Sequence, residues 1–103
     1  MNKTRVFTAS RLTSGNFLFP VRIEVSLERV AQIRPNLIGS EEESIAMSKV
    51  ASVSIHTGFL WSRIRIDSTG GTNPIISDGH PKSDAREIQV LIDRYQQETA
   101  KAV

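Results

Sequence analysis

Two small groups of side chains in this chain have types and spacings that could do chemistry. Asp78, His80 and Asp84 could ligate a metal ion, although one histidine with two carboxylates is a weak signature and Asp84 also suits a helix N-terminus. Ser54 and His56 could act as nucleophile and base, but the chain has no Gly-x-Ser-x-Gly elbow to position such a serine. We therefore predict that the chain is not an enzyme and holds neither a metal nor another cofactor.

Charge is distributed unevenly along the chain, whose net charge is +2. Residues 1–40 hold six basic and two acidic residues, whereas residues 41–103 hold seven basic and nine acidic residues. This asymmetry would steer an anionic partner toward the first strands. We predict that Arg22, Arg63 and Arg65 form an outward, anion- or lipid-facing group, with separately solvated arginines as the alternative. Because Glu24 and Asp67 interrupt these arginines and aromatic residues are few, we expect no nucleic-acid binding.

Two aromatic clusters are predicted to make contacts. Phe59 and Trp61 follow Gly58 at an expected hairpin connection, and tryptophan often anchors an interface because it buries a large area and keeps one polar group. We predict a protein interface there; the alternative is that Phe59 or Leu60 plugs the core. Phe17 and Phe19 make the connection between Leu12 and Pro20 apolar, so these rings either enter the core or contact a membrane or partner.

The elements that must position these residues are mostly strands. Alternating apolar and polar residues place Val21, Ile23, Val25 and Leu27 on one strand face. The predicted strands cover residues 7–12, 21–28, 30–34, 45–48, 53–57, 63–67 and 75–76. Pro35-Asn36 is expected to break the ladder, and Glu41-Glu42-Glu43 to form an exposed loop or hairpin tip. Residues 48–52, 68–73 and 78–81 are expected to be turns or loops.

A single helix is predicted over residues 83–98, after strands spanning residues 5–80. Ser83 or Asp84 is the expected N-cap, with Glu87 in the first turn. The spacing of three and four residues places one set of apolar side chains on the inner face: Ala85, Ile88, Leu91, Ile92 and Tyr95.

Length and composition favour one domain covering residues 1–103. The chain has no cysteine, which excludes disulfides and thiolate metal sites. We find neither a secretory signal pattern nor an apolar run long enough for a membrane helix, so we expect a cytoplasmic location.

The pattern of residues 45–53, Thr57-Gly58-Phe59-Leu60, residues 64–71 and residues 82–88 resembles the bacterial pleckstrin-homology (PH-like) domain family. The resemblance implies a partly open, seven-stranded antiparallel barrel of two near-orthogonal sheets, capped by a C-terminal α-helix. It also implies a binding or assembly module, since some such domains self-associate. Eukaryotic relatives often bind lipid head groups through a basic first loop, but residues 13–19 hold no lysine or arginine.

The sequence therefore predicts a non-catalytic module that binds a protein partner or a second copy of itself. Exposed edge strands and loop tips would make the contacts. The alternative is a domain that binds an anionic membrane surface through Phe17, Phe19 and nearby arginines.

Overall fold

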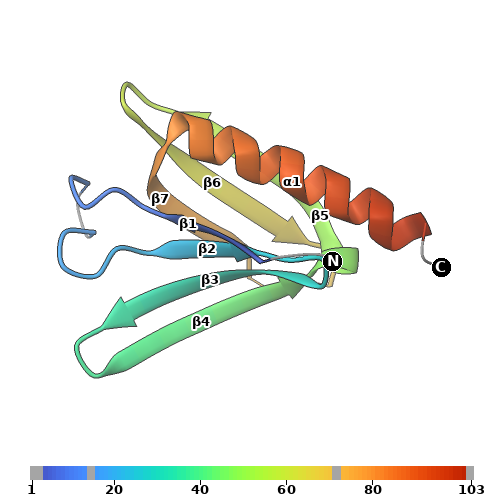
Figure 1. Ribbon diagram of the computed structural model, residues 1–103, viewed down its shortest axis with the longest axis horizontal. Helices are drawn as coiled ribbons and strands as arrows, with labels where there is room; N and C mark the ends of the chain where they lie inside the picture. Colours follow the sequence, from blue (N-terminus) through green and yellow to red (C-terminus); the bar gives the residue numbers. More distant parts are fainter. Residues whose placement is uncertain (1–3, 14–15, 71–72, 102–103) are drawn as a thin grey trace.

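The computed structural model describes residues 4–13, 16–70 and 73–101, which form seven strands in two antiparallel sheets and one C-terminal helix (Figure 1). The first sheet has the order β1-β2-β3-β4 and the second β5-β6-β7. The elements are β1 (Arg5–Thr8), β2 (Arg22–Val25), β3 (Arg29–Asn36), β4 (Gly39–Ala46), the 3-10 turn η1 (Met47–Lys49), β5 (Val50–Thr57), β6 (Trp61–Ser68), β7 (Ile75–Pro81) and α1 (Lys82–Lys101). The predicted mainly β fold is confirmed, and the arrangement is compatible with a PH-like barrel.

The hydrophobic core lies where the inner faces of the two sheets meet α1. Ile23 and Val25 from β2 face Ile64 and Ile66 from β6, and all four are fully buried. The predicted inner face of the helix is confirmed, because Ala85, Ile88, Leu91, Ile92 and Tyr95 are all buried. Burying an aliphatic side chain of this size stabilises the fold by about 1.5–3 kcal/mol.

The β3–β4 hairpin corrects two predictions. Pro35 lies within β3, opposite Ser40, and does not break the ladder. Pairing of β3 with β2 ends at Ile33, so the missing N–H of Pro35 leaves no gap on that side. Residues 41–43 are exposed, as expected, but they belong to β4, where an edge strand open to water tolerates glutamates. The tip is therefore Leu37-Ile38.

The junction of β7 and α1 also differs from the prediction. Residues 78–81 continue β7 instead of forming a loop, because Asp78 and Gly79 together oppose Arg63 in a β-bulge. Gly79 has a φ of 85°, the left-handed conformation that glycine adopts without strain. The helix then begins directly at Lys82, so Ser83 and Asp84 both lie in its first turn and neither is the N-cap.

Other boundaries shift while the strands keep their places in the order. The first strand is shorter and earlier than predicted, Arg5–Thr8 against residues 7–12. The strands predicted over residues 53–57 and 63–67 each gain residues at one or both ends. The predicted turn at Gly70-Gly71 lies partly outside the described residues.

The outer edge of β7 is closed by groups from the first sheet and its first loop. Gln32 Nε2 donates to the carbonyl oxygen of Ile76 at 2.6 Å, and Ser10 N–H donates to that of Gly79 at 2.9 Å. Asn16 Nδ2 donates to the Asp78 carbonyl at 3.3 Å, while Asn16 Oδ1 accepts from Val21 N–H at 2.8 Å. This set of contacts, called the β7 seam below, joins the two sheets.

A polar cluster is buried inside the second sheet. His80 and Ser77 are fully buried, and His80 Nε2 lies 2.6 Å from Ser77 Oγ. His80 Nδ1 and Ser62 Oγ have no hydrogen-bond partner among the described residues. Burial disfavours the imidazolium form, which lowers the pKa of His80 from 6.5 to about 4 despite the opposing effect of Asp78.

Replacing Gly79 with alanine is expected to destabilise the protein by about 2–4 kcal/mol. The added Cβ would meet Thr13 Oγ1 at 2.3 Å and Asn16 Nδ2 at 2.8 Å, and φ would be strained as well. Urea unfolding measures the effect. Gly39→Ala is the matched control, because its Cβ meets nothing within 4 Å. Equal stability of the two variants would contradict the role assigned to the bulge.

Acidification from pH 7 to pH 5 is expected to cost about 2 kcal/mol of stability through His80. The unfolded chain binds a proton near pH 6.5, whereas the folded chain resists protonation until about pH 4. Stability from this group is therefore complete above pH 6.5 and declines as pH falls toward 4. In His80→Gln the urea midpoint of unfolding should change less between pH 7 and pH 5 than in the wild-type protein. In His56→Gln, a change at an exposed site, it should change with pH as in the wild type. An unchanged pH dependence in His80→Gln would refute the assignment.

Candidate interaction surfaces

Large exposed apolar side chains gather at one end of the molecule. Among the described residues, all such side chains except Val6 and Val90 lie in the β1–β2, β3–β4 and β5–β6 connections. Figure 1 shows these three connections at the same end. We call this set the apolar end; it comprises Leu12, Phe17, Leu18, Phe19, Leu37, Ile38, Phe59 and Leu60. Ile38 is 96% exposed, Phe59 82% and Phe17 71%, so these tips project from the fold.

Local hydrogen bonds hold each tip in place. Arg11 Nη1 donates to the carbonyl oxygens of Phe17 at 2.9 Å and Leu18 at 3.3 Å. Asn36 Oδ1 accepts from Ile38 N–H at 3.1 Å, and Gly58 N–H donates to the Trp61 carbonyl at 2.8 Å. The tips are therefore shaped by polar contacts that leave their apolar side chains in water.

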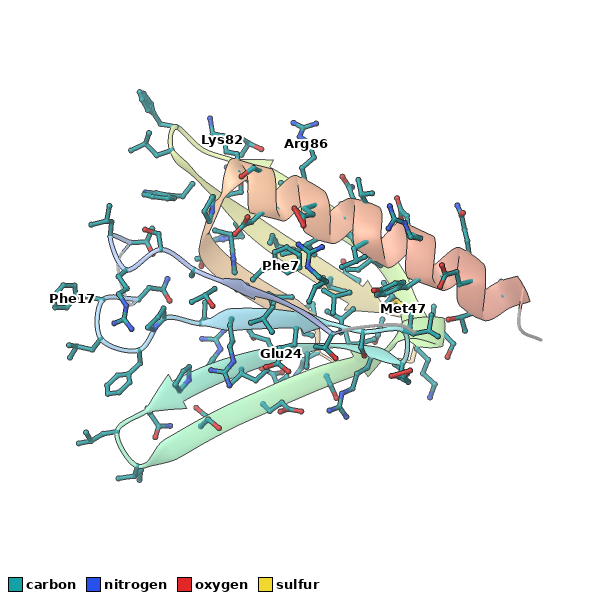
Figure 2. All side chains as sticks on the ribbon, viewed as in Figure 1. Phe7, Phe17, Glu24, Met47, Lys82 and Arg86 are labelled. Carbon is teal, nitrogen blue, oxygen red and sulfur yellow. The ribbon has the colours of Figure 1, made fainter. Side chains whose placement is uncertain are left out.

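The predicted aromatic sites both fall at or beside this end. Phe17 and Phe19 do not enter the core, and Figure 2 shows Phe17 pointing away from the body. Phe59 is exposed at the β5–β6 tip, and neither it nor Leu60 plugs the core. Trp61 is half-buried at the base of that hairpin, opposite Pro81. The predicted interface role of Phe59 and Trp61 stays a prediction.

Leu37 and Ile38 complete the apolar end but were not singled out from the sequence. In the sequence, the three glutamates at positions 41–43 predict the loop or hairpin tip instead. The available signal was the Asn36 and Gly39 pair, two turn-forming residues that flank the aliphatic dipeptide.

The predicted anion-facing arginines do not form one patch. Arg22 lies on the outer face of the first sheet, beside Glu24 at 3.2 Å. Arg63 and Arg65 lie on the outer face of the second sheet, where they line a shallow depression of about 460 Å³ with Ser54, Ile55, His56 and Ile76. Both are engaged by carboxylates, since Arg63 Nε donates to Asp78 at 2.6 Å and Arg65 Nε to Asp67 at 3.1 Å. The hydrogen bond with Asp78 raises the pKa of Arg63.

The side chains weighed as metal ligands point in different directions. His80 is buried beside Ser77, whereas Asp78 is exposed and binds Arg63. Asp84 sits in the first turn of α1, where burial and nearby Glu87 raise its pKa and Arg5 opposes that change. The described residues hold no cluster of three or more metal-ligating side chains.

The weighed nucleophile and base, Ser54 and His56, are exposed on the outer face of β5. Strand alternation places them opposite Arg65 and Arg63, respectively, on β6. In the described part of the chain, Ser54 and His56 therefore lie on a solvated strand face and not in an enclosed site.

The free edge of the second sheet is the other exposed feature. β5 ends the strand order and pairs with β6 alone in the described part of the chain. The Gly58 N–H donates to the Trp61 carbonyl, so Gly58 and Trp61 form a hydrogen-bonded pair. In an antiparallel ladder such pairs alternate with pairs whose backbone groups point away from the partner strand. The N–H and C=O groups of Val53, Ile55 and Thr57 therefore point away from β6.

A search of the described residues finds no helix that is long and apolar enough to cross a membrane. No protein-family model matches the chain, and a search of curated proteins finds no match to it.

Proposed function

We propose that this chain is a non-catalytic, PH-like binding module that self-associates by pairing the β5 edges of two copies. Pairing would be antiparallel about a twofold axis, so that two three-stranded sheets become one continuous sheet. The observation that carries the proposal is an edge strand of eight residues without a charged side chain, whose one bulge lies at its start, between Val50 and Ser52, and leaves residues 53–57 regular.

The first feature is the absence of charge. No Asp, Glu, Lys or Arg occurs from Val50 to Ser62. By contrast, the free edge strand of the first sheet, β4, has three consecutive glutamates, which would repel a second β4. The β7 edge is already occupied by the β7 seam. The other edge of the first sheet, β1, has only four residues and is joined to α1 by the Arg5–Glu87 ion pair. Of the four edges, β5 is the one suited to accept a strand.

The second feature is incomplete burial beside this edge. Val53 and Ile55 pack against the core yet are only half-buried. Between β5 and the start of α1 lies a depression of about 280 Å³, lined by Ile55, Thr57, Lys82, Arg86 and Gln89. A second β5 strand would cover the exposed parts of both aliphatic side chains, which adds apolar burial to the new main-chain hydrogen bonds.

Ser54→Glu is expected to shift the protein toward monomer, weakening association severalfold. The new carboxylate faces Arg65 within its own sheet, so the fold should tolerate it, but two copies would bring like charges together. Light scattering on a size-exclusion column over a concentration series measures the mass.

Ser44→Glu, the same change on the exposed β4 edge, should leave the oligomer mass unaltered. Thr57→Pro removes one outward N–H without touching the β6 ladder and should act like Ser54→Glu. A wild-type protein that is monomeric at all concentrations, or a Ser44→Glu effect equal to that of Ser54→Glu, would overturn the proposal.

A further inference from the structure

We propose that the apolar end docks on the surface of an anionic lipid bilayer, with the three tips inserted among the lipids. This inference does not depend on self-association, because it rests on different residues. It starts from where the apolar side chains are exposed. Hairpin tips usually carry polar turn residues, yet here all three connections at one end present aliphatic or aromatic groups (Figure 1).

The shape of this end favours a bilayer over a folded partner. The tips belong to three separate connections, and two of the strongly exposed residues, Ile38 and Phe59, lie in connections of different sheets. They project individually instead of lining one groove. A folded partner would need a matching recess for each tip, whereas mobile lipid chains can fill the space around any projecting side chain.

Charge at this end complements anionic head groups. No Asp or Glu occurs in residues 9–20, 35–40 or 57–62, which contain the three connections. Arg11 lies in the first connection, bound to the carbonyls of Phe17 and Leu18. Lys82 begins α1 at the same end (Figure 2). Cations beside inserted apolar groups are the combination that holds peripheral proteins on anionic lipid surfaces.

The charges set back from the tips do not reverse this balance. Glu41 on β4 lies opposite Arg34 in the strand register. Asp78 on β7 is held by Arg63 at 2.6 Å. Asp78 is therefore paired with a guanidinium and Glu41 lies across the strand pair from one, while Arg11 and Lys82 supply positive charge at the apolar end.

The tip backbones are also prepared for a less aqueous environment. Burying an unpaired N–H or C=O in lipid is costly, so exposed irregular backbone is poorly suited to insertion. Here Arg11 already satisfies the carbonyls of Phe17 and Leu18, Asn36 satisfies the N–H of Ile38, and Gly58 satisfies the carbonyl of Trp61. These contacts lower the cost of removing water from the tips.

Trp61 provides a built-in reporter, because it is the only tryptophan in the chain and sits at the base of the β5–β6 tip. Tryptophan favours the membrane–water interface. Wild-type protein mixed with vesicles of phosphatidylserine and phosphatidylcholine at low salt should co-sediment with them, and its Trp61 emission should shift to shorter wavelength. Binding should weaken at high salt and with vesicles of phosphatidylcholine alone.

The variants test the tips one by one. Phe17→Ser, Ile38→Ser and Phe59→Ser should each lower the vesicle partition coefficient by up to about tenfold, and the triple variant by more. Val90→Ser is the matched control, because Val90 is 52% exposed but lies on α1 outside the connections. Thermal unfolding checks that each variant is folded. Because the three tips are separate, one misfolded variant leaves two others to test.

Several results would overturn the inference. These are absence of binding to anionic vesicles at low salt, equal binding to neutral vesicles, or equal losses in Val90→Ser and Phe59→Ser. Loss of oligomer mass in the tip variants, without loss of vesicle binding, would assign the end to a second copy instead. The edge variant Ser54→Glu should keep vesicle binding, so self-association and lipid binding fail or succeed separately.

Discussion

The rest of the structure depends on how the outer edge of β7 is closed. A strand edge carries polar backbone groups that need partners, and at this edge three carbonyls, those of Ile76, Asp78 and Gly79, accept hydrogen bonds from the first sheet and its first connection. The donors are Gln32, Asn16 and Ser10. Two of these groups come from the chain just after β1, so the same bonds that join the sheets also fix the path of that connection. The fold and the position of one apolar tip therefore share a single set of contacts.

This seam also decides which edges of the two sheets stay free. The outer edge of β7 is occupied, and β1 is joined to α1 through the Arg5–Glu87 ion pair. The edge strands that remain as candidates for pairing with a second copy are β4 and β5. The glutamates of β4 and the uncharged run of β5 then have opposite consequences for contact between copies. Gly79 makes this arrangement possible, because its positive φ turns the β7 backbone toward Thr13 and Asn16 where no larger residue fits.

Much of the fold could be predicted from the sequence, because local periodicity sets which side chains face the core. The inner faces of β2, β6 and α1 follow alternation or helical spacing, and each is buried as expected. Pro35 and Gly79 were misjudged for a different reason. Whether a proline interrupts a strand depends on where its neighbour ends, and whether a glycine ends a strand or forms a bulge depends on the opposite strand. In both cases the outcome depends on residues that are distant in the sequence.

The interaction surfaces were only partly predictable for the same reason. Phe17, Phe19 and Phe59 stood out as apolar residues in connections, but nothing local indicated that their connections share one end with Leu37-Ile38. Similarly, Arg22, Arg63 and Arg65 all occupy outward-facing positions in the alternating pattern of their strands. Only the assignment of those strands to two different sheets shows that Arg22 lies apart from the other two. The charged and apolar residues can be identified in the sequence, whereas which of them lie together in space depends on the topology of the two sheets.

The direction of β5 has a consequence for geometry on a larger scale. This strand runs toward the apolar end, since the β5–β6 connection lies at its C-terminal end (Figure 1). Two copies joined by antiparallel β5 edges would therefore carry their apolar ends on opposite poles. Such a pair could not rest both ends on one flat membrane. It would instead be a two-headed tether that spans the gap between two lipid surfaces, with a separation set by the length of one strand and its hairpins.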